Sequence, residues 1–462
     1  MKLSFHGANQ DVTGSCHLLQ IGERLILIDC GLFQGGRELD EENGVPFGFD
    51  ARAIDFVLLT HAHLDHCGRL PLLVNRGFRG EIITTQPTAE LARLVMLDSA
   101  NLQEEAARPH DPHGKKHVQA APSKPPLYTI TDTMDCIARF GRTTTYQEPI
   151  EVCPGVRATF YNAGHILGSA SILVEGKDQT GSHSILFSGD IGGAGHHFLL
   201  PPNPPSSADT VVMETTYGDR LHRPFEESLT EFYDAVKSAL SRGGNVVIPT
   251  FALERAQELL FFLRQGVEDS RLPPALNVYL DSPMAISATQ IFERHKDAFV
   301  PEVQKLFGEG KDPFSLPGLH FTRDRSDSIA INSVKSGAII MAGSGMATGG
   351  RIRQHLEYNI SRPECSVIFV GYAATGTAAR RIIDGAKDVS ILGKYVPVRA
   401  QIHTINGFSA HADQKELLAW RDSIADKQMT VLVHGELGSM QTFAGKLTGK
   451  VLMPKLNDEI DL

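Results

Sequence analysis

The chain has few of the features that mark secreted, membrane or zinc-ribbon proteins. Its 462 residues include six cysteines and no CxxC pair. This argues against a disulfide framework or a cysteine zinc ribbon and favours a reducing compartment. The start, MKLSFHGANQDV, has no apolar signal region, and no run of about 18 apolar residues occurs anywhere. We therefore predict a cytoplasmic protein with no membrane attachment.

Positive charge is also scarce, because 44 Lys and Arg face 54 Asp and Glu and leave a formal charge of −10. Proteins that wrap nucleic acid are usually basic, so any nucleic-acid binding must depend on local basic groups or bound cations. The hydrophobic fraction of 42% is ordinary for a globular protein, and the length suggests two or three domains. The 19 histidines are the first indication of metal.

Two sequence patterns divide the chain. The first part contains short apolar strands separated by turns, and a polar, proline-containing stretch at 98–126 predicts an exposed loop. From about 209, apolar strands alternate with turns and helices, as in NVVIP before FALERAQELLFFLRQ and GAIIMA before GSGMATGGRIRQHLEY. This second pattern is typical of a parallel α/β sheet.

The strongest motif is THAHLDHCG, residues 60–68, which follows an apolar strand. It places four ligand-type side chains within six positions: His61, His63, Asp65 and His66. Imidazole nitrogens and carboxylate oxygens are typical ligands of catalytic zinc, and sites without thiolates tend to keep a position open for water. A loop after a strand can also turn neighbouring side chains toward different ions. The motif therefore predicts a catalytic metal centre.

Further ligands are expected at later strand ends, because one short motif cannot complete two coordination shells. Three candidates follow apolar strands beside glycine: His165 in YNAGHILGSA, Asp190 in SILFSGDIGG and His434 in TVLVHGE. Each alone is more often a polar turn residue, but the shared position favours a ligand. Asp190 and His434 lie 244 residues apart, so a whole domain must be inserted between them.

The motifs resemble those of a known superfamily. THAHLDH, with Asp29, His165 and Asp190, resembles the metallo-β-lactamase fold, and ETTYGDR, NGFSAHAD and LVHGE resemble its β-CASP branch of nucleic-acid-processing nucleases. The similarity spans almost the whole chain and is greatest to the RNA-cleaving group, which includes the cleavage and polyadenylation endonuclease and its bacterial single-chain relatives. It implies an α/β fold, an αββα sandwich with an inserted β-CASP domain. The expected domains are 1–208 and 396–462 for the sandwich and 209–395 for the insertion.

The resemblance also implies two zinc ions per chain. The ligands of the first would be His61, His63 and His165, those of the second Asp65, His66 and His434, and Asp190 would bridge them. Asp29 would lie behind the ligands and orient an imidazole. A strand-end carboxylate that caps a turn is the alternative reading of Asp29.

The remaining branch motifs imply an acid pair beside the metals, Glu214 and His411. The histidine would protonate the leaving alkoxide, and a nearby carboxylate favours imidazolium. Asp65 and Asp190 are expected to be catalytic as well as metal ligands. The alternative for His411 is a turn residue before the following helix, and the alternative for Glu214 is a salt bridge to Arg220.

Substrate phosphates are expected at a glycine-rich loop of the inserted domain. Gly343-Ser344-Gly345-Met346 lies between a strand and a helix, where backbone N–H groups can bind an anion. We expect phosphate contacts from Ser344, Gly345, Arg351 and Arg255, and a tight turn with solvated arginines is the alternative. Aromatic residues are poorly interleaved with these positions, which favours contacts to the backbone of single-stranded RNA over base reading.

The expected function is zinc-dependent hydrolysis of RNA, in RNA processing or decay. A hydroxide bridging the two ions would attack phosphorus and leave 5′-phosphate and 3′-hydroxyl ends. Endonuclease action is expected, and 5′→3′ exonuclease action and a homodimer stay open. The alternatives are a DNA-processing nuclease of the same branch, whose members lack the histidine that His434 supplies, and a non-catalytic RNA-binding subunit, which typically has lost ligands. A small-molecule hydrolase would have no use for the inserted domain.

Overall fold

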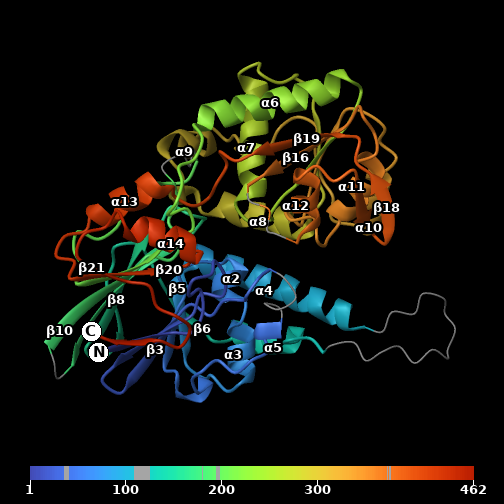
Figure 1. Cartoon of the computed structure of the whole chain (residues 1–462). Helices are drawn as coiled ribbons and strands as arrows, with labels where there is room; N and C mark the ends of the chain where they lie inside the picture. The colour runs from blue at the N-terminus through green and yellow to red at the C-terminus, as the bar shows by residue number, and fades with distance from the viewer. Residues whose placement is uncertain (36–40, 109–124, 179–180, 194–197, 372, 374–375) are drawn as a thin grey trace, which may run out of the picture. The chain divides into compact units, whose positions relative to one another are not determined.

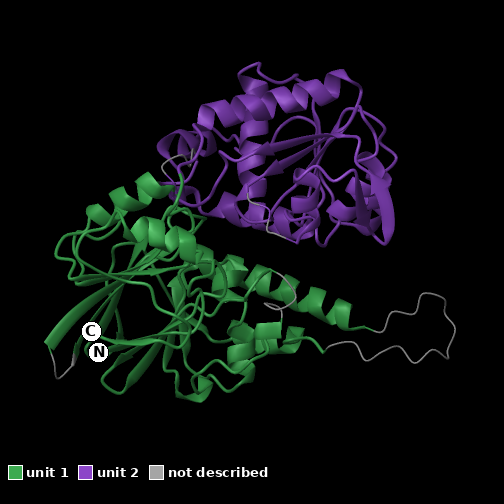
Figure 2. Ribbon diagram, viewed as in Figure 1, with its two compact units in different colours: residues 1–192, 201–220, 413–462 green, residues 193–200, 221–412 purple. Residues whose placement is uncertain are grey.

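The computed structural model describes residues 1–35, 41–108, 125–178, 181–193, 198–371, 373 and 376–462. The chain forms two compact units, coloured separately in Figure 2. The first unit contains residues 1–192, 201–220 and 413–462, and the second contains residues 193–200 and 221–412.

The main junctions between the units follow residues 220 and 412, which is 12 and 17 residues beyond the predicted boundaries at 208 and 395. Strand pairing explains both differences. Thr210–Glu214 pairs with strands of the first unit on both sides, so it belongs to that unit. Gln401–Ile405 pairs with a strand of the second unit. The apolar pattern of a strand does not reveal which sheet it joins.

The first unit contains two seven-stranded sheets (Figure 1). In spatial order, the strands of one sheet are β22 (Glu459–Asp461), β1 (Lys2–Phe5), β2 (His17–Ile21), β3 (Arg24–Ile28), β4 (Phe56–Leu58), β5 (Glu81–Thr85) and β6 (Phe140–Thr144). Those of the other are β21 (Lys450–Leu452), β20 (Met429–Val433), β11 (Thr210–Glu214), β10 (Gly181–Phe187), β9 (Ala170–Asp178), β8 (Val156–Asn162) and β7 (Ile150–Cys153).

One apolar core joins the two sheets. Buried side chains from both inner faces pack together, among them Phe5, Ile28, Phe160, Phe187 and Val212. The helices of this unit that lie wholly in the described residues are η1 (Ala51–Ala53), α2 (Leu64–Cys67), α3 (Leu70–Asn75), α4 (Gln86–Ala107), α5 (Ile130–Ile137), α13 (Gln414–Asp422) and α14 (Leu437–Ala444). Since α4 packs on β5 and β6, and α14 packs on β20, the unit has the predicted αββα layers.

Helix α4 corrects one prediction. It continues to Ala107, so the loop expected from residue 98 is wrong for 98–107. Polar side chains of its last turns bind the returning chain: Gln103 Oε1 accepts from Leu127 N at 2.9 Å, and Glu104 Oε1 accepts from Ile130 N at 2.7 Å. The rest of the expected loop, at 109–124, lies outside the described residues.

The second unit is built around a six-stranded parallel sheet. In spatial order its strands are β14 (Leu319–Phe321), β13 (Asn277–Leu280), β15 (Ala338–Ala342), β12 (Val246–Pro249), β16 (Ser366–Val370) and β19 (Gln401–Ile405), and β17 (Asp388–Ile391) pairs separately with β18 (Lys394–Pro397). The helices are α6 (Phe225–Ser241), α7 (Arg255–Glu268), α8 (Pro283–Arg294), η2 (Lys296–Ala298), α9 (Pro301–Gly308), α10 (Arg325–Ile331), α11 (Ile352–Asn359) and α12 (Ala378–Ile383). Strands such as AIIMA are buried throughout, as strands covered on both faces must be.

A buried polar network fastens two helices of this unit to its sheet. Asp281, which follows β13, accepts from Ser328 Oγ of α10 at 2.6 Å and from Arg351 Nη1, at the start of α11, at 2.7 Å. Its Oδ2 also lies 2.6 Å from His355 Nε2. Burial alone would raise the pKa of Asp281, but these hydrogen bonds hold it below its ordinary value of 3.8.

Asp281→Asn is expected to lower the free energy of unfolding by about 3–5 kcal/mol, because the cationic partner of a buried charge is left uncompensated. Since the folded-state pKa of Asp281 is lowered, its stabilisation is present above pH 3.8 and is lost as the pH falls through the folded value. Urea unfolding at pH 7 and at pH 3 measures both effects. Equal midpoints for wild type and variant at pH 7 would contradict this role.

Candidate metal centre

The candidate ligands of the first unit converge because they follow strand ends. Asp29 comes directly after β3, Asp190 comes three residues after β10, and His434 comes directly after β20. Strand β3 runs parallel to β4, and β10, β11 and β20 are mutually parallel. Because the carboxyl ends of parallel strands meet at one edge of a sheet, motifs far apart in the sequence reach the same place.

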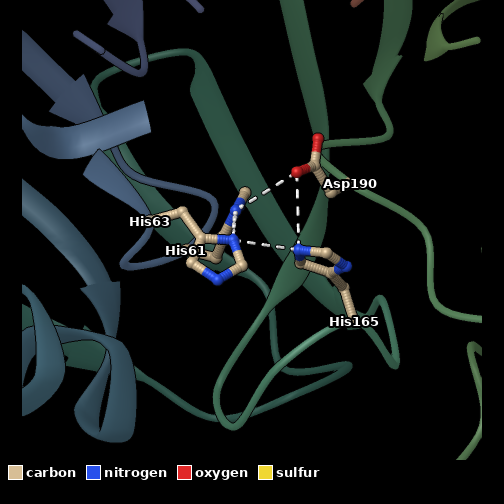
Figure 3. Close-up of side chains that lie close together, drawn as sticks. All are labelled: His61, His63, His165 and Asp190. Carbon is tan, nitrogen blue, oxygen red and sulfur yellow. Dashed lines mark hydrogen bonds and ion pairs between the residues drawn. The ribbon is translucent and has the colours of Figure 1, made fainter. Parts of the chain in front are cut away.

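Four donor atoms form a first group, shown in Figure 3. His63 Nδ1 lies 3.2 Å from His61 Nε2 and 3.1 Å from His165 Nε2. Asp190 Oδ2 lies 3.4 Å from both of those Nε2 atoms. Three of the four residues are buried, and His63 is partly exposed.

These spacings fit a tetrahedral ion. Zinc binds imidazole nitrogen at about 2.0–2.1 Å, which places neighbouring ligand atoms of a tetrahedron about 3.3–3.4 Å apart. The four distances of the first group, between 3.1 and 3.4 Å, have this size. The donor set of three imidazoles and one carboxylate is also one that zinc accepts.

A second group lies on the other side of Asp190. His66 Nε2 is 3.2 Å from Asp190 Oδ1 and 3.3 Å from His434 Nε2, which is 3.5 Å from Asp65 Oδ2. Asp190 therefore presents Oδ2 to the first group and Oδ1 to the second. This arrangement would allow one carboxylate to serve both groups.

The polar network behind the ligands fixes their tautomers. Asp29 accepts from Thr60 N at 2.8 Å and from Thr60 Oγ1 at 2.8 Å, and its Oδ2 lies 2.7 Å from His66 Nδ1. Since Thr60 Oγ1 uses its proton on Asp29, it accepts from His61 Nδ1 at 3.1 Å. Both imidazoles thus carry a proton on Nδ1 and direct Nε2 toward the donor groups.

Two threonines of this network were not predicted. Thr60 lies behind His61, and Thr216 Oγ1 lies 3.2 Å from His434 Nδ1 while donating to the His434 carbonyl at 3.2 Å. Both threonines lie inside motifs described above, since Thr60 opens THAHLDH and Thr216 is the second threonine of ETTYGDR. The sequence does not distinguish them from ordinary threonines at strand ends.

The His-rich motif packs tightly against the segment after β3. Cys30 N donates to the His66 carbonyl and Ser15 N to the Asp65 carbonyl, both at 2.8 Å. A Cβ atom at position 31 would lie 1.5 Å from the Asp65 carbonyl oxygen, so only Gly31 permits this approach. The backbone of the ligand loop is therefore held from behind.

The electrostatics of the site favour a bound cation. Burial, together with neighbouring His66, lowers the pKa of His61 to about 3, so this imidazole is neutral near pH 7, as a metal ligand must be. Burial opposes the charged form of His66, but Asp190 and Asp29 raise its pKa well above the usual range. Asp190 and Asp65 likewise raise the pKa of His434. The carboxylates thus create a strong negative field.

Comparison with known proteins agrees with this geometry. Residues 10–115 match the metallo-beta-lactamase superfamily, 256–382 the Beta-Casp domain, and 395–454 the Zn-dependent metallo-hydrolase RNA specificity domain. Ribonuclease TTHA0252 of Thermus thermophilus is 40% identical over 94% of this chain and 93% of its own. The chain belongs to the β-CASP branch of the metallo-β-lactamase superfamily. The predicted resemblance and fold class are confirmed.

Other relatives match over most of this chain. Transcription termination factor FttA of Methanocaldococcus jannaschii is 31% identical, and the match covers 96% of this chain and 68% of the FttA chain. An RNase J-like protein of the same organism is 28% identical, and the match covers 96% of this chain and 94% of that protein. A solved protein of unknown function from Enterococcus faecalis, 14% identical, superposes with a TM-score of 0.56 over 100% of this chain and 99% of its own. That structure shares the fold.

The two residues expected as the β-CASP acid pair lie in different units. Glu214 ends β11 in the first unit, is fully buried, and forms a third compact group with Asp190 and His434. Its Oε1 accepts from Ile191 N at 2.5 Å, next to Asp190. His411 lies in the second unit, two residues before the chain returns to the first unit at Asp413.

The four residues expected to contact phosphate all lie in the second unit. Arg255 is buried and ion-paired with Glu258, and Arg351 binds Asp281 and the carbonyls of neighbouring residues. Both arginines therefore have structural partners, which differs from the alternative of solvated arginines, and their contact with phosphate stays a prediction. Ser344 Oγ accepts from Thr348 N and Gly349 N at 3.2 and 3.3 Å, which closes the glycine-rich loop on itself.

Asp29→Asn is expected to weaken zinc binding by about 10–100-fold, because an amide has one acceptor oxygen, whereas Thr60 N and His66 Nδ1 use different oxygens of Asp29. Asparagine tolerates the left-handed backbone found at Asp29 (φ 59°), so the fold should persist. Competition with a chromogenic chelator measures the affinity. Asp55→Asn is the matched control, because Asp55 also accepts a backbone N–H, from Leu25, without belonging to the ligand network. Unchanged zinc affinity in Asp29→Asn would contradict its role.

Proposed function

We propose that this β-CASP protein is a metal-dependent ribonuclease that hydrolyses RNA phosphodiesters and leaves 5′-phosphate and 3′-hydroxyl ends. The observation that carries the proposal is the pair of donor groups on the two oxygens of Asp190. The matched RNA specificity domain at 395–454 and the relatives named ribonuclease and RNase J-like favour RNA as the substrate.

Two zinc ions per chain are part of this proposal. One ion would be held by His61, His63 and His165. The other would be held by Asp65, His66 and His434, and Asp190 would contribute to both. When bound, zinc supplies a Lewis acid that lowers the pKa of water and neutralises charge on a phosphate. Asp29 and Thr60 would keep the Nε2 atoms of His66 and His61 directed at the ions. The charge of two divalent ions would let an acidic chain attract RNA.

We assign proton transfer to His411. The departing 3′-oxygen needs a proton to leave as a hydroxyl, and histidine is the side chain whose ordinary pKa best suits that task near neutral pH. Glu214 is the carboxylate that we assign to the same step. Its hydrogen bond to Ile191 N also supports a second task, because it holds the backbone next to Asp190.

For RNA binding we retain Ser344 and Gly345 as the phosphate contacts. The glycine leaves room for a ring, since a Cβ atom at 345 would lie 2.7 Å from the Phe251 side chain, which is 44% exposed. A base can stack on an exposed ring of this kind. Arg351 and Arg255 would support RNA binding indirectly, through their ion pairs with Asp281 and Glu258.

None of the described helices is long and apolar enough to cross a membrane.

Removal of metal is expected to abolish RNA cleavage, and added zinc to restore it. Wild-type protein should bind two zinc ions per chain, and His63→Ala should bind one tightly, because His63 contributes only to the first group. Metal analysis after dialysis measures the stoichiometry. Two tightly bound ions in His63→Ala would contradict the ligand assignment.

Zinc-loaded wild-type protein is expected to cut 5′-labelled single-stranded RNA into products with 5′-phosphate ends and to spare DNA of the same sequence. His411→Ala should be slower by about 10²–10⁴-fold, the usual contribution of a general acid. Gel analysis with end-group mapping measures both. Products with 2′,3′-cyclic phosphate ends would exclude attack by water and contradict the proposal.

A further inference from the structure

A second histidine holds the backbone of His411. His222 Nε2 lies 3.0 Å from the His411 carbonyl oxygen. Because a carbonyl oxygen only accepts, Nε2 must carry a proton and donate it. Neutral imidazole with its proton on Nε2 and imidazolium both provide this donor, so the hydrogen bond can persist on either side of the histidine pKa.

The position of His222 in the chain gives this contact its importance. Segment 221–412 of the second unit begins one residue before His222 and ends one residue after His411. The hydrogen bond therefore joins the two ends of that segment, through residues that lie 189 positions apart in the sequence. His222 follows ETTYGDR in the sequence and is not a member of the donor groups described above.

Residues before His411 are anchored as well. Phe408 is 1% exposed and packs against Phe225, Phe232 and Phe262, with ring centroids 5.5, 5.8 and 5.8 Å away. The guanidinium of Arg255 lies 6.0 Å from the Phe408 ring centroid. Ser409 Oγ also accepts from His411 N at 3.2 Å and donates to the His411 carbonyl at 3.3 Å, a longer hydrogen bond than that of His222. The loop is thus fixed at Phe408, and His222 fixes its other end at the His411 carbonyl.

We propose that His222 is a positioning residue for proton transfer: its Nε2 donor fixes the backbone of His411 so that the His411 imidazole meets the leaving 3′-oxygen. This inference rests on the proposed acid role of His411. A misplacement of about 1 Å in a catalytic group can cost about 10²-fold in rate, so one backbone hydrogen bond is enough to matter. Its loss should slow the step that needs the proton and leave substrate binding nearly unchanged.

The test compares two RNA substrates with His222 variants. One substrate is ordinary RNA, and the other has sulfur in place of the 3′-oxygen at the cleaved linkage. A thiolate leaves without a proton, so this substrate needs no general acid. His222→Gln keeps an N–H donor near the position of Nε2, whereas the shorter amide of His222→Asn cannot reach the carbonyl.

On ordinary RNA, His222→Ala and His222→Asn are expected to lower kcat by about 10–100-fold with KM within about twofold, and His222→Gln to recover most of the rate. On the sulfur substrate all three should approach wild type. Equal defects on both substrates would show a merely structural role and overturn the inference, as would a normal rate for His222→Ala on ordinary RNA. If His222→Ala does not fold, the comparison of Gln with Asn decides.

His411→Ala separates this inference from the proposed function. If the sulfur substrate does not restore His411→Ala, the acid role itself fails. If it restores His411→Ala but not His222→Ala, only the positioning role of His222 fails. His320→Ala is the matched control, because His320 is an exposed histidine on β14 of the same unit, and its rates should equal those of wild type on both substrates.

Discussion

The buried carboxylate of Asp190 is the feature on which the site depends. It is 1% exposed, and each of its oxygens faces two imidazoles at 3.2 to 3.6 Å. A buried charge of this kind is stable only if cations or hydrogen bonds compensate it. Parallel strands β10, β11 and β20 bring Asp190, Glu214 and His434 to one edge of their sheet, and β3 with β4 brings Asp29 and the His-rich motif to an edge of the other sheet.

Much of this centre was predictable because its signals are local. THAHLDH places four donors within six residues, and His165, Asp190 and His434 share a place after an apolar strand. Because these side chains must lie close together, the long separation of Asp190 and His434 in the sequence also predicted an inserted domain between them. The resemblance to β-CASP motifs predicted which residues share an ion. That grouping stays a prediction, and the structure brings the donor atoms of each group within 4.8 Å of one another.

The sequence was least informative where a distant partner decides the outcome. Arg351 follows a glycine-rich loop, and only the fold shows that Asp281, 70 residues earlier, binds its guanidinium. The polar residues at 98–107 resemble a loop, yet Gln103 and Glu104 use their side chains to bind the returning chain. The contact of His222 with His411 spans 189 residues and has no sequence pattern at all.

The most direct test of the proposed two-metal centre is a crystal structure of the zinc-loaded protein with anomalous scattering measured on both sides of the zinc absorption edge. Two anomalous peaks are expected, one among His61, His63 and His165 and the other among Asp65, His66 and His434, with an oxygen of Asp190 bound to each. A single peak, or a second peak bound to other residues while Asp190 contacts only one ion, would contradict the account.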